Sequence, residues 1–223
     1  MQKMIDRIII KRIQQASSPD RATLVLGPRR VGKTTMLRDL ILNDQTYLFL
    51  DGDDPLIRDE LTNPSFAELR SIIGANKLVF IDEAQRIENI GLTVKMVVDR
   101  IEHVTVYMSG SSTIDLNDTV HEPLTGRKWQ YTLLPLSYEE IELQWGYLEA
   151  KAQLANRILY GSYPEVVTNP GQERKILSEL ADSYLYRDVL NWGGLRKPEY
   201  LDKLVKMLAY QIGHEVSYNE LAN

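Results

Sequence analysis

The sequence predicts an α/β protein built on a central, parallel five-stranded sheet that is followed by a helical region. Short apolar runs alternate with helical patterns along the first 135 residues. Strands that alternate with helices in this way form parallel sheets covered on both faces. A glycine-rich segment follows the first apolar run and an acidic pair follows the third. Because ligands bind at the carboxyl ends of parallel strands, both segments are expected at one edge of the sheet.

The strands and helices of the sheet region follow from the spacing of apolar residues. The predicted strands cover residues 22–26, 47–50, 78–81, 104–108 and 129–134. The predicted helices between them cover residues 33–42, 64–73 and 90–102, where apolar residues recur at helical spacing. The same spacing near the amino terminus predicts an amphipathic helix packed on the domain; its apolar positions are Met4, Ile5, Ile8, Ile9 and Ile13.

Beyond Leu136 the strand-like runs stop and the pattern becomes helical. The predicted helices cover residues 138–145, 148–159, 173–190 and 199–212, and residues 161–165 (GSYPE) are typical of a structural turn. The segment from Ser217 to Glu220 has the pattern of a capping box that opens a helix, and the chain ends three residues later. We therefore expect a fragment of a longer protein, with a core at 1–135, a helical lid at 136–198 and a truncated module at 199–223.

Composition excludes several kinds of site. The 223 residues are 43% hydrophobic and 26% charged, with a net charge of −5, which is typical of a soluble globular protein. The chain has no cysteine, which excludes disulfides, thiolate catalysis and cysteine–zinc sites, and its three histidines have no metal-ligand spacing. No apolar run approaches the ~20 residues that span a bilayer. These features favour a cytoplasmic protein without a membrane partner.

The strongest chemical signal is a Walker A pattern, G-x-x-x-x-G-K-[ST], in the run Gly27-Pro28-Arg29-Arg30-Val31-Gly32-Lys33-Thr34. Glycines let such a loop turn its N–H groups toward phosphate oxygens, and the helix that follows adds its positive end. Lys33 is expected to reach the β- and γ-phosphates, and the Thr34 hydroxyl to ligate Mg²⁺. With Thr35 the expected nucleotide-binding segment is 27–35. The alternative is an ordinary glycine-rich turn, but the position between a strand and a helix favours the phosphate loop.

The third predicted strand is followed directly by two acidic residues, Asp82 and Glu83, which are therefore expected at the same edge of the sheet as the Walker A segment. We expect Asp82 to hold Mg²⁺ and Glu83 to orient and polarise the attacking water. The alternative is an acidic strand end on the surface. Ser109 or Ser111, which follow the next strand, is a candidate sensor of the γ-phosphate, although small polar residues at strand ends also form plain turns.

Arg127 follows the serine segment and is a candidate arginine finger, which neutralises charge on the γ-oxygens during phosphoryl transfer. Its alternative is a solvated charge or an ion pair. At least one of Arg29 and Arg30 is expected to face solvent or an acidic partner. A finger acting in trans requires self-association, whereas a finger acting in cis does not.

Several segments together resemble a family of bacterial and archaeal AAA-type ATPases that carry an amino-terminal ATPase core and a carboxyl-terminal domain of unknown function. These segments are, in order, GPRRVGKTT, FIDEAQ, SGSS, LTGR, LPLSYEE, GSYPEVV and YLYRDVL. The resemblance covers roughly residues 5–223. It implies the additional-strand P-loop class, with the sensor strand between the Walker A and Walker B strands. It also implies ATP rather than GTP, and a winged-helix module that begins in 199–223.

Three functions are compatible with these patterns. The first is an ATPase that cycles between ATP and ADP and moves attached domains or partners. The second is a nucleotide-gated switch or adaptor with little turnover, favoured by the long helical tail. The third is a DNA-binding regulator or motor, in which nucleic acid is bound only through the missing carboxyl-terminal part, because the net charge of this chain is acidic.

Overall fold

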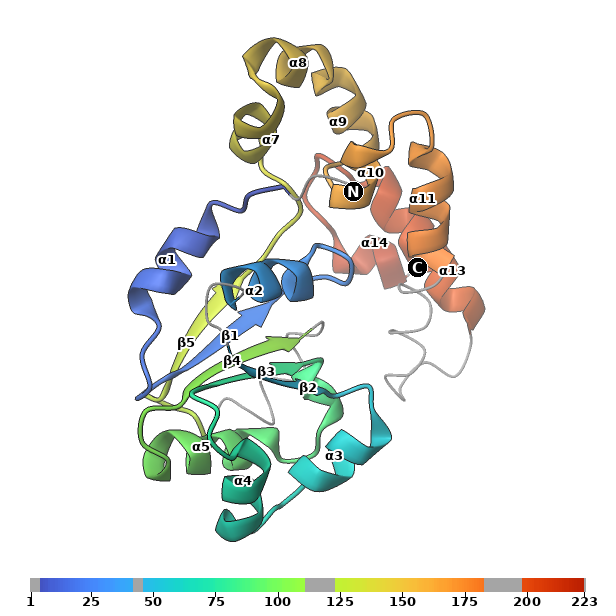
Figure 1. Cartoon of the computed structure of the whole chain (residues 1–223). Helices are drawn as coiled ribbons and strands as arrows, with labels where there is room; N and C mark the ends of the chain where they lie inside the picture. Colours follow the sequence, from blue (N-terminus) through green and yellow to red (C-terminus); the bar gives the residue numbers. More distant parts are fainter. Residues whose placement is uncertain (1–4, 42–45, 111–122, 183–197, 223) are drawn as a thin grey trace. The chain divides into compact units, whose positions relative to one another are not determined.

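Figure 1 shows the computed structural model, which describes residues 5–41, 46–110, 123–182 and 198–222. Five strands form one sheet in the order β2-β3-β4-β1-β5, and every neighbouring pair is parallel. The strands are β1 (Ala22–Leu26), β2 (Leu48–Asp51), β3 (Leu78–Asp82), β4 (Thr105–Gly110) and β5 (Lys128–Thr132). β4 lies between β1 and β3. The predicted parallel sheet and the additional strand between the two motif-bearing strands are therefore confirmed.

The chain divides into two compact units, Met1–Thr168 and Asn169–Asn223. Helices of the first unit are α1 (Ile9–Ala16), α2 (Lys33–Ile41), α3 (Pro55–Leu61), α4 (Phe66–Ile73), α5 (Ile90–Arg100), α7 (Tyr138–Trp145), α8 (Tyr147–Ala152), α9 (Leu154–Tyr160) and α10 (Pro164–Thr168), with the 3₁₀ turn η1 (Ala84–Arg86). Helices of the second unit are α11 (Glu173–Leu180), α13 (Pro198–Tyr210) and α14 (Tyr218–Ala222).

The two faces of the sheet have separate hydrophobic cores because side chains alternate along each strand. On β1, Leu24 and Leu26 pack with residues of α4 and α5, whereas Val25 packs on the opposite face with residues of α1 and α2. Figure 1 shows these helices on the two sides of the sheet. Strands that are buried on both faces consist of continuous apolar runs, so β1 and β3 could be predicted from the sequence.

The amino-terminal helix packs on the core as predicted. It begins at Ile9 rather than at Met4, and Ile13 is fully buried against the cluster that contains Val25 and Phe80. The residues before it form an extended connection, in which Ile5 packs against a third cluster built on Leu136 and Ile141. Ile5 and Ile13 thus pack in different clusters although both fit the helical spacing, and Met4 lies outside the described residues.

The helices differ from the predicted ranges in three further places. The prediction omitted α3, in which Pro55 occupies the first turn and the Asp54 carboxylate accepts a hydrogen bond from Leu56 N. The predicted helix at 148–159 is divided at Gln153 into α8 and α9. The last two residues of the predicted turn at 161–165 begin the short helix α10.

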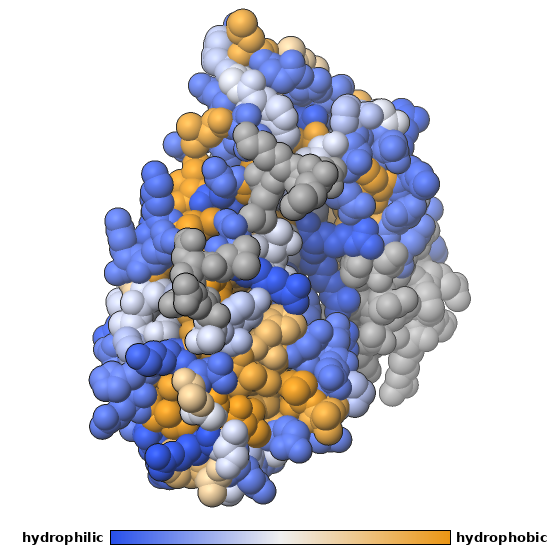
Figure 2. Space-filling view, in the orientation of Figure 1, coloured by the Kyte–Doolittle hydropathy of each residue, from blue (hydrophilic) through white to orange (hydrophobic). Residues whose placement is uncertain are grey.

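On the face that Figure 2 shows, hydrophilic residues predominate, and most of the apolar residues gather in the lower part of the view. Large exposed side chains occur on α3 and α5, at Leu56 and Leu92, and on α7 to α9. No helix in the described ranges is both long and apolar enough to cross a membrane.

Candidate functional site

The segment of residues 27–32 is the loop that joins β1 to α2 at the carboxyl edge of the sheet. A Cβ atom on Gly27 would lie 2.1 Å from Leu133 O, so only glycine fits where the loop passes the residue that follows β5. Gly32 has φ +93° and Arg30 has φ +59°, in the left-handed region where the chain reverses. This backbone is the curled shape that presents successive N–H groups to an anion.

Lys33 is the first residue of α2 and its side chain returns into the loop. Lys33 Nζ donates to Gly27 O at 3.0 Å and to Pro28 O at 2.9 Å. Burial lowers the pKa of Lys33, and the nearby Glu83 and Asp82 carboxylates oppose that change. The ammonium therefore lies against the phosphate-loop backbone, near enough to Asp82 and Glu83 for their charges to act on it.

Thr34, Asp82 and Ser109 meet at one point although they lie on three elements. Thr34 Oγ1 donates to Asp82 Oδ2 at 2.8 Å, and Ser109 Oγ donates to Asp82 Oδ1. Ser109 is fully buried and Asp82 nearly so. The strand order β3-β4-β1 produces this meeting, because parallel strands end at the same edge.

Asp82 and Thr34 fit a magnesium site of the kind that is completed by substrate phosphates. Mg²⁺ prefers oxygen ligands and commonly takes one or two carboxylates together with phosphate oxygens and water. The Asp82 carboxylate and the Thr34 hydroxyl are such donors and already share one location. No cluster of three histidine, aspartate or glutamate side chains that could hold a metal alone occurs among the described residues.

Glu83 is turned out of the strand by a left-handed residue conformation, with φ 46° and ψ 42°. Its backbone N–H donates to Ser109 Oγ at 3.4 Å, and its Oε2 accepts from Gln85 Nε2 at 2.5 Å. Gly52 approaches the same peptide: Gly52 N donates to Asp82 O at 2.9 Å, and a Cβ there would lie 2.5 Å from Glu83 O. The direction of Glu83 thus depends on β2 and β4 as well as on its own strand.

Comparison with known proteins agrees with this geometry. A family model described as an AAA domain matches residues 19–142, more than half of the chain. The chain belongs to the AAA domain family. A second model, a domain of unknown function, matches residues 151–223, so the pair of domains has the order that the sequence motifs indicated.

The AAA domain has relatives in archaea and bacteria. An uncharacterized protein of Methanocaldococcus jannaschii is 25% identical over 97% of this chain and 53% of its own length. An uncharacterized protein of Mycobacterium tuberculosis is 27% identical over 95% of this chain and 46% of its own length. The chain therefore spans about half the length of these relatives. A solved structure, the Walker-type ATPase of Pyrococcus abyssi, shares the fold with a TM-score of 0.60 at 19% identity, covering 90% of this chain and 79% of that one.

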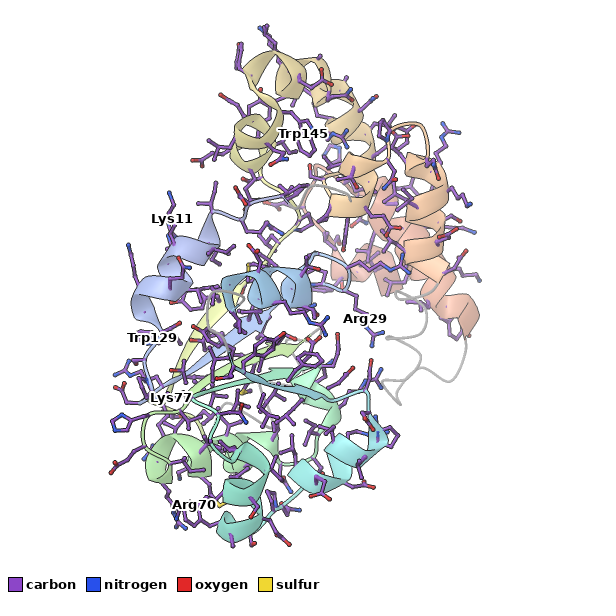
Figure 3. The ribbon with its side chains drawn as sticks, in the orientation of Figure 1. Lys11, Arg29, Arg70, Lys77, Trp129 and Trp145 are labelled. Carbon is purple, nitrogen blue, oxygen red and sulfur yellow. The ribbon has the colours of Figure 1, made fainter. Side chains whose placement is uncertain are left out.

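The structure does not bring Arg127 to the nucleotide loop of its own AAA domain. Arg127 O accepts from Ala22 N at 2.8 Å, at the start of β1, whereas Gly27 follows the end of that strand. Arg127 Nε pairs with Asp99 Oδ1 at 2.6 Å. Figure 3 labels Lys77 and Trp129 at this amino-terminal edge and Arg29 at the other. A finger acting in cis does not fit this arrangement, and one acting in trans stays a prediction.

The other predicted site residues differ in their exposure. Pro28 and Arg30 are exposed, Val31 is a buried residue of the loop, and Thr35 is an exposed residue of α2. Arg30 Nη1 pairs with Glu165 Oε2 of α10 at 3.0 Å, so one loop arginine does face an acidic partner. Ser111 lies outside the described residues.

Sequence reasoning missed three residues that shape the site: Gly52, Gln85 and Arg7. Gly52 and Gln85 were visible only as parts of the strings DGDD and DEAQ, and their roles depend on contacts between strands and turns. Arg7 stands in the amino-terminal segment, 24 positions before the loop residue whose carbonyl it contacts. No local pattern marks that contact.

Proposed function

We propose that this AAA domain binds ATP with Mg²⁺ at loop 27–32 and hydrolyses it. The observation that carries the proposal is the hydrogen bond between the Thr34 hydroxyl and the Asp82 carboxylate, 2.8 Å long, beside Lys33. It joins the two predicted magnesium ligands from separate elements at the end of the phosphate loop. The alternative, in which Asp82 is only an acidic residue at a strand end, does not account for its pairing with Thr34.

Each side chain has a defined part in the proposed reaction. The loop N–H groups and the Lys33 ammonium bind the phosphates, while Thr34 and Asp82 hold Mg²⁺. The ion, when bound, neutralises charge on the β- and γ-oxygens. Glu83 orients a water whose oxygen joins the γ-phosphorus as the bond to the ADP oxygen breaks, and receives a proton from that water. Ser109 holds the Asp82 carboxylate through its hydroxyl and contacts the Glu83 peptide.

The test is ATP binding and turnover by wild type, Lys33→Ala and Glu83→Gln, with and without Mg²⁺. We expect Lys33→Ala to lose binding, and Glu83→Gln to bind ATP but turn it over very slowly. Equal turnover by all three proteins would contradict the proposal, because the activity would then come from elsewhere.

A nucleotide-gated switch with little turnover is the second candidate. The contact between Gln85 and Glu83 favours it, because an amide that holds the base in place also restrains its approach to water. Tight ATP binding by wild type, without turnover at any protein concentration, selects the switch. Turnover that disappears in Glu83→Gln selects the enzyme.

The parts beyond the AAA core support a broader proposal about what nucleotide binding drives. We place a helical lid at 136–198 and the start of a winged-helix module at 199–223, and the second family model at 151–223 lies within this region. In a protein of the full length of these relatives, the ATP cycle would move this region against attached domains or nucleic acid. Salt-dependent DNA affinity of that longer protein, absent from this chain, supports the nucleic-acid version, and no affinity in either removes it.

A further inference from the structure

Arg7 is a buried arginine in the connection before α1, and its side chain is only 6% exposed. An arginine is rarely buried unless its donors are satisfied, because removing a charge from water is costly. Its guanidinium is a planar fork with five N–H donors and no acceptor. The partners of that fork therefore indicate what the residue holds together.

The guanidinium of Arg7 joins three separate parts of the first unit. Nη1 donates to Val31 O of the phosphate loop at 2.8 Å, and Nη2 donates to Leu134 O at 2.6 Å, just after β5. Nε donates to Glu140 Oε1 of α7 at 3.0 Å, in an ion pair with both side chains buried. Figure 1 shows the segment before α1 passing the connection from β5 to α7, where these contacts form.

Glu140 is itself held rigidly. Its Oε2 accepts from Ser137 N at 2.9 Å, and Glu140 N donates to Ser137 Oγ at 3.1 Å, which forms the capping box of α7. Its Oε1 also accepts from Ile8 N at 3.0 Å. The carboxylate that orients Arg7 is thus fixed by the start of a helix and by the backbone next to Arg7.

The contact with Val31 has a consequence for the phosphate loop. The Val31 carbonyl and the Gly32 N–H belong to one planar, trans peptide, so they point in opposite directions. When Arg7 holds the carbonyl, it also sets the direction of the Gly32 N–H, one of the donors of a Walker A loop. Gly32 has φ +93°, so this peptide would otherwise be free to turn at a residue without a side chain.

We infer that Arg7 is a positioning residue of the nucleotide site, which orients the Val31–Gly32 peptide for phosphate binding and connects the loop to α7. This inference rests on the proposed ATP binding. The donors of Arg7 are directed at Glu140, Val31 O and Leu134 O, so Arg7 acts through the loop backbone. It therefore affects the affinity for ATP and leaves the hydrolysis step, which depends on Glu83, nearly unchanged.

The test compares Arg7→Met and Arg7→Lys with wild type in equilibrium binding of ATP·Mg²⁺ and in turnover at saturating ATP. We expect the Kd of Arg7→Met to rise at least tenfold, with kcat within threefold of wild type. Arg7→Lys keeps the charge opposite Glu140 but lacks the planar guanidinium that reaches two carbonyls. Its Kd for ATP should therefore lie between those of wild type and Arg7→Met. Ile73→Ala, a buried truncation on α4, is the control for lost stability and should retain wild-type Kd.

The outcomes separate this inference from the proposed function. If wild type binds ATP and both Arg7 variants bind within twofold of it, the inference is overturned and the function stands. If wild type does not bind ATP, both are overturned. Should Arg7→Met fail to fold, Arg7→Lys decides alone, since it retains the buried charge pair. The inference would also be overturned if Ile73→Ala, at the same loss of stability, raised the Kd for ATP as much as Arg7→Met does.

Discussion

Thr34 Oγ1 donates a hydrogen bond to Asp82 Oδ2 across 48 positions of sequence, and this contact brings the end of the phosphate loop to the acidic end of β3. The carboxyl ends of β1, β4 and β3 are neighbours at one edge of the sheet, which brings the start of α2 near Asp82. Ser109 of β4 donates to the other oxygen of the Asp82 carboxylate. The proposed magnesium ligands are therefore arranged by three strands and one helix start.

Replacing Asp82 by asparagine should weaken the response to Mg²⁺. Asparagine keeps the size of the side chain but removes the charge, and losing one charge-assisted contact of about 1.5–3 kcal/mol corresponds to a roughly 10–100-fold weaker affinity. Titration of turnover with Mg²⁺ measures the change. Asp59→Asn on the exposed face of α3 is the matched control and should leave the titration unchanged. An unaltered Mg²⁺ midpoint in Asp82→Asn would remove Asp82 from the magnesium site.

Gly52→Ala should slow turnover through Glu83. The added Cβ would lie 2.5 Å from Glu83 O and 2.9 Å from Asp82 O, so the β3 end must shift, at a cost of about 1–3 kcal/mol in stability. We expect kcat to fall with little change in Kd for ATP. Gly74→Ala, strained at φ +57° but remote from the acids, controls for stability loss. Full activity in Gly52→Ala would show that Glu83 tolerates the shift.

Gln85→Ala tests how Glu83 is held. The Gln85 amide donates to Glu83 Oε2 at 2.5 Å, and removing it should reduce kcat about tenfold, the effect of one lost charge-assisted contact. Kd for ATP should not change. An increase in kcat would instead indicate that Gln85 restrains the base, which is the behaviour of a switch.

Lys33→Met should stabilise the nucleotide-free protein at neutral pH. Burial lowers the pKa of Lys33 in the fold, so below that folded pKa the buried ammonium reduces stability. As the pH rises from the folded pKa toward the ordinary lysine value, the folded state loses its proton first and wild type regains stability. At neutral pH, thermal unfolding should show a higher Tm for Lys33→Met than for wild type, by about 2–4 °C for each kcal/mol gained in the free energy of unfolding. The difference in Tm between the two proteins should become smaller at alkaline pH. A difference independent of pH would contradict this account.

Arg127 gives a test of association. As a finger in trans it predicts that turnover per site rises with protein concentration, and that Arg127→Ala loses about 10³-fold or more of that activity. Its pairing with Asp99 at the amino-terminal edge predicts unchanged ATP binding by the same variant. Turnover that is independent of concentration, and equal in Arg127→Ala, would exclude the finger.

The sequence alone determined the class of fold and the main residues of the candidate site. Strands buried on both faces form uninterrupted apolar runs, and the Walker A spacing is local, so both can be read from neighbouring residues. Ser109 was a candidate, with Ser111 as its alternative, because both follow the end of a predicted strand. The amino-terminal limit of α1 was not a local property, because Ile5 and Ile13 pack in different clusters.

Only the tertiary structure decided which of these residues meet. Lys33, Thr34, Asp82 and Ser109 converge because the strand order places three parallel strand ends together. The same order places Arg127 at the opposite edge, although it follows Ser109 in sequence just as a finger might. Arg7 and Gly52 act through contacts with backbone carbonyls, and carbonyls are identical at every residue. No pattern of side chains can reveal such contacts before the chain has folded.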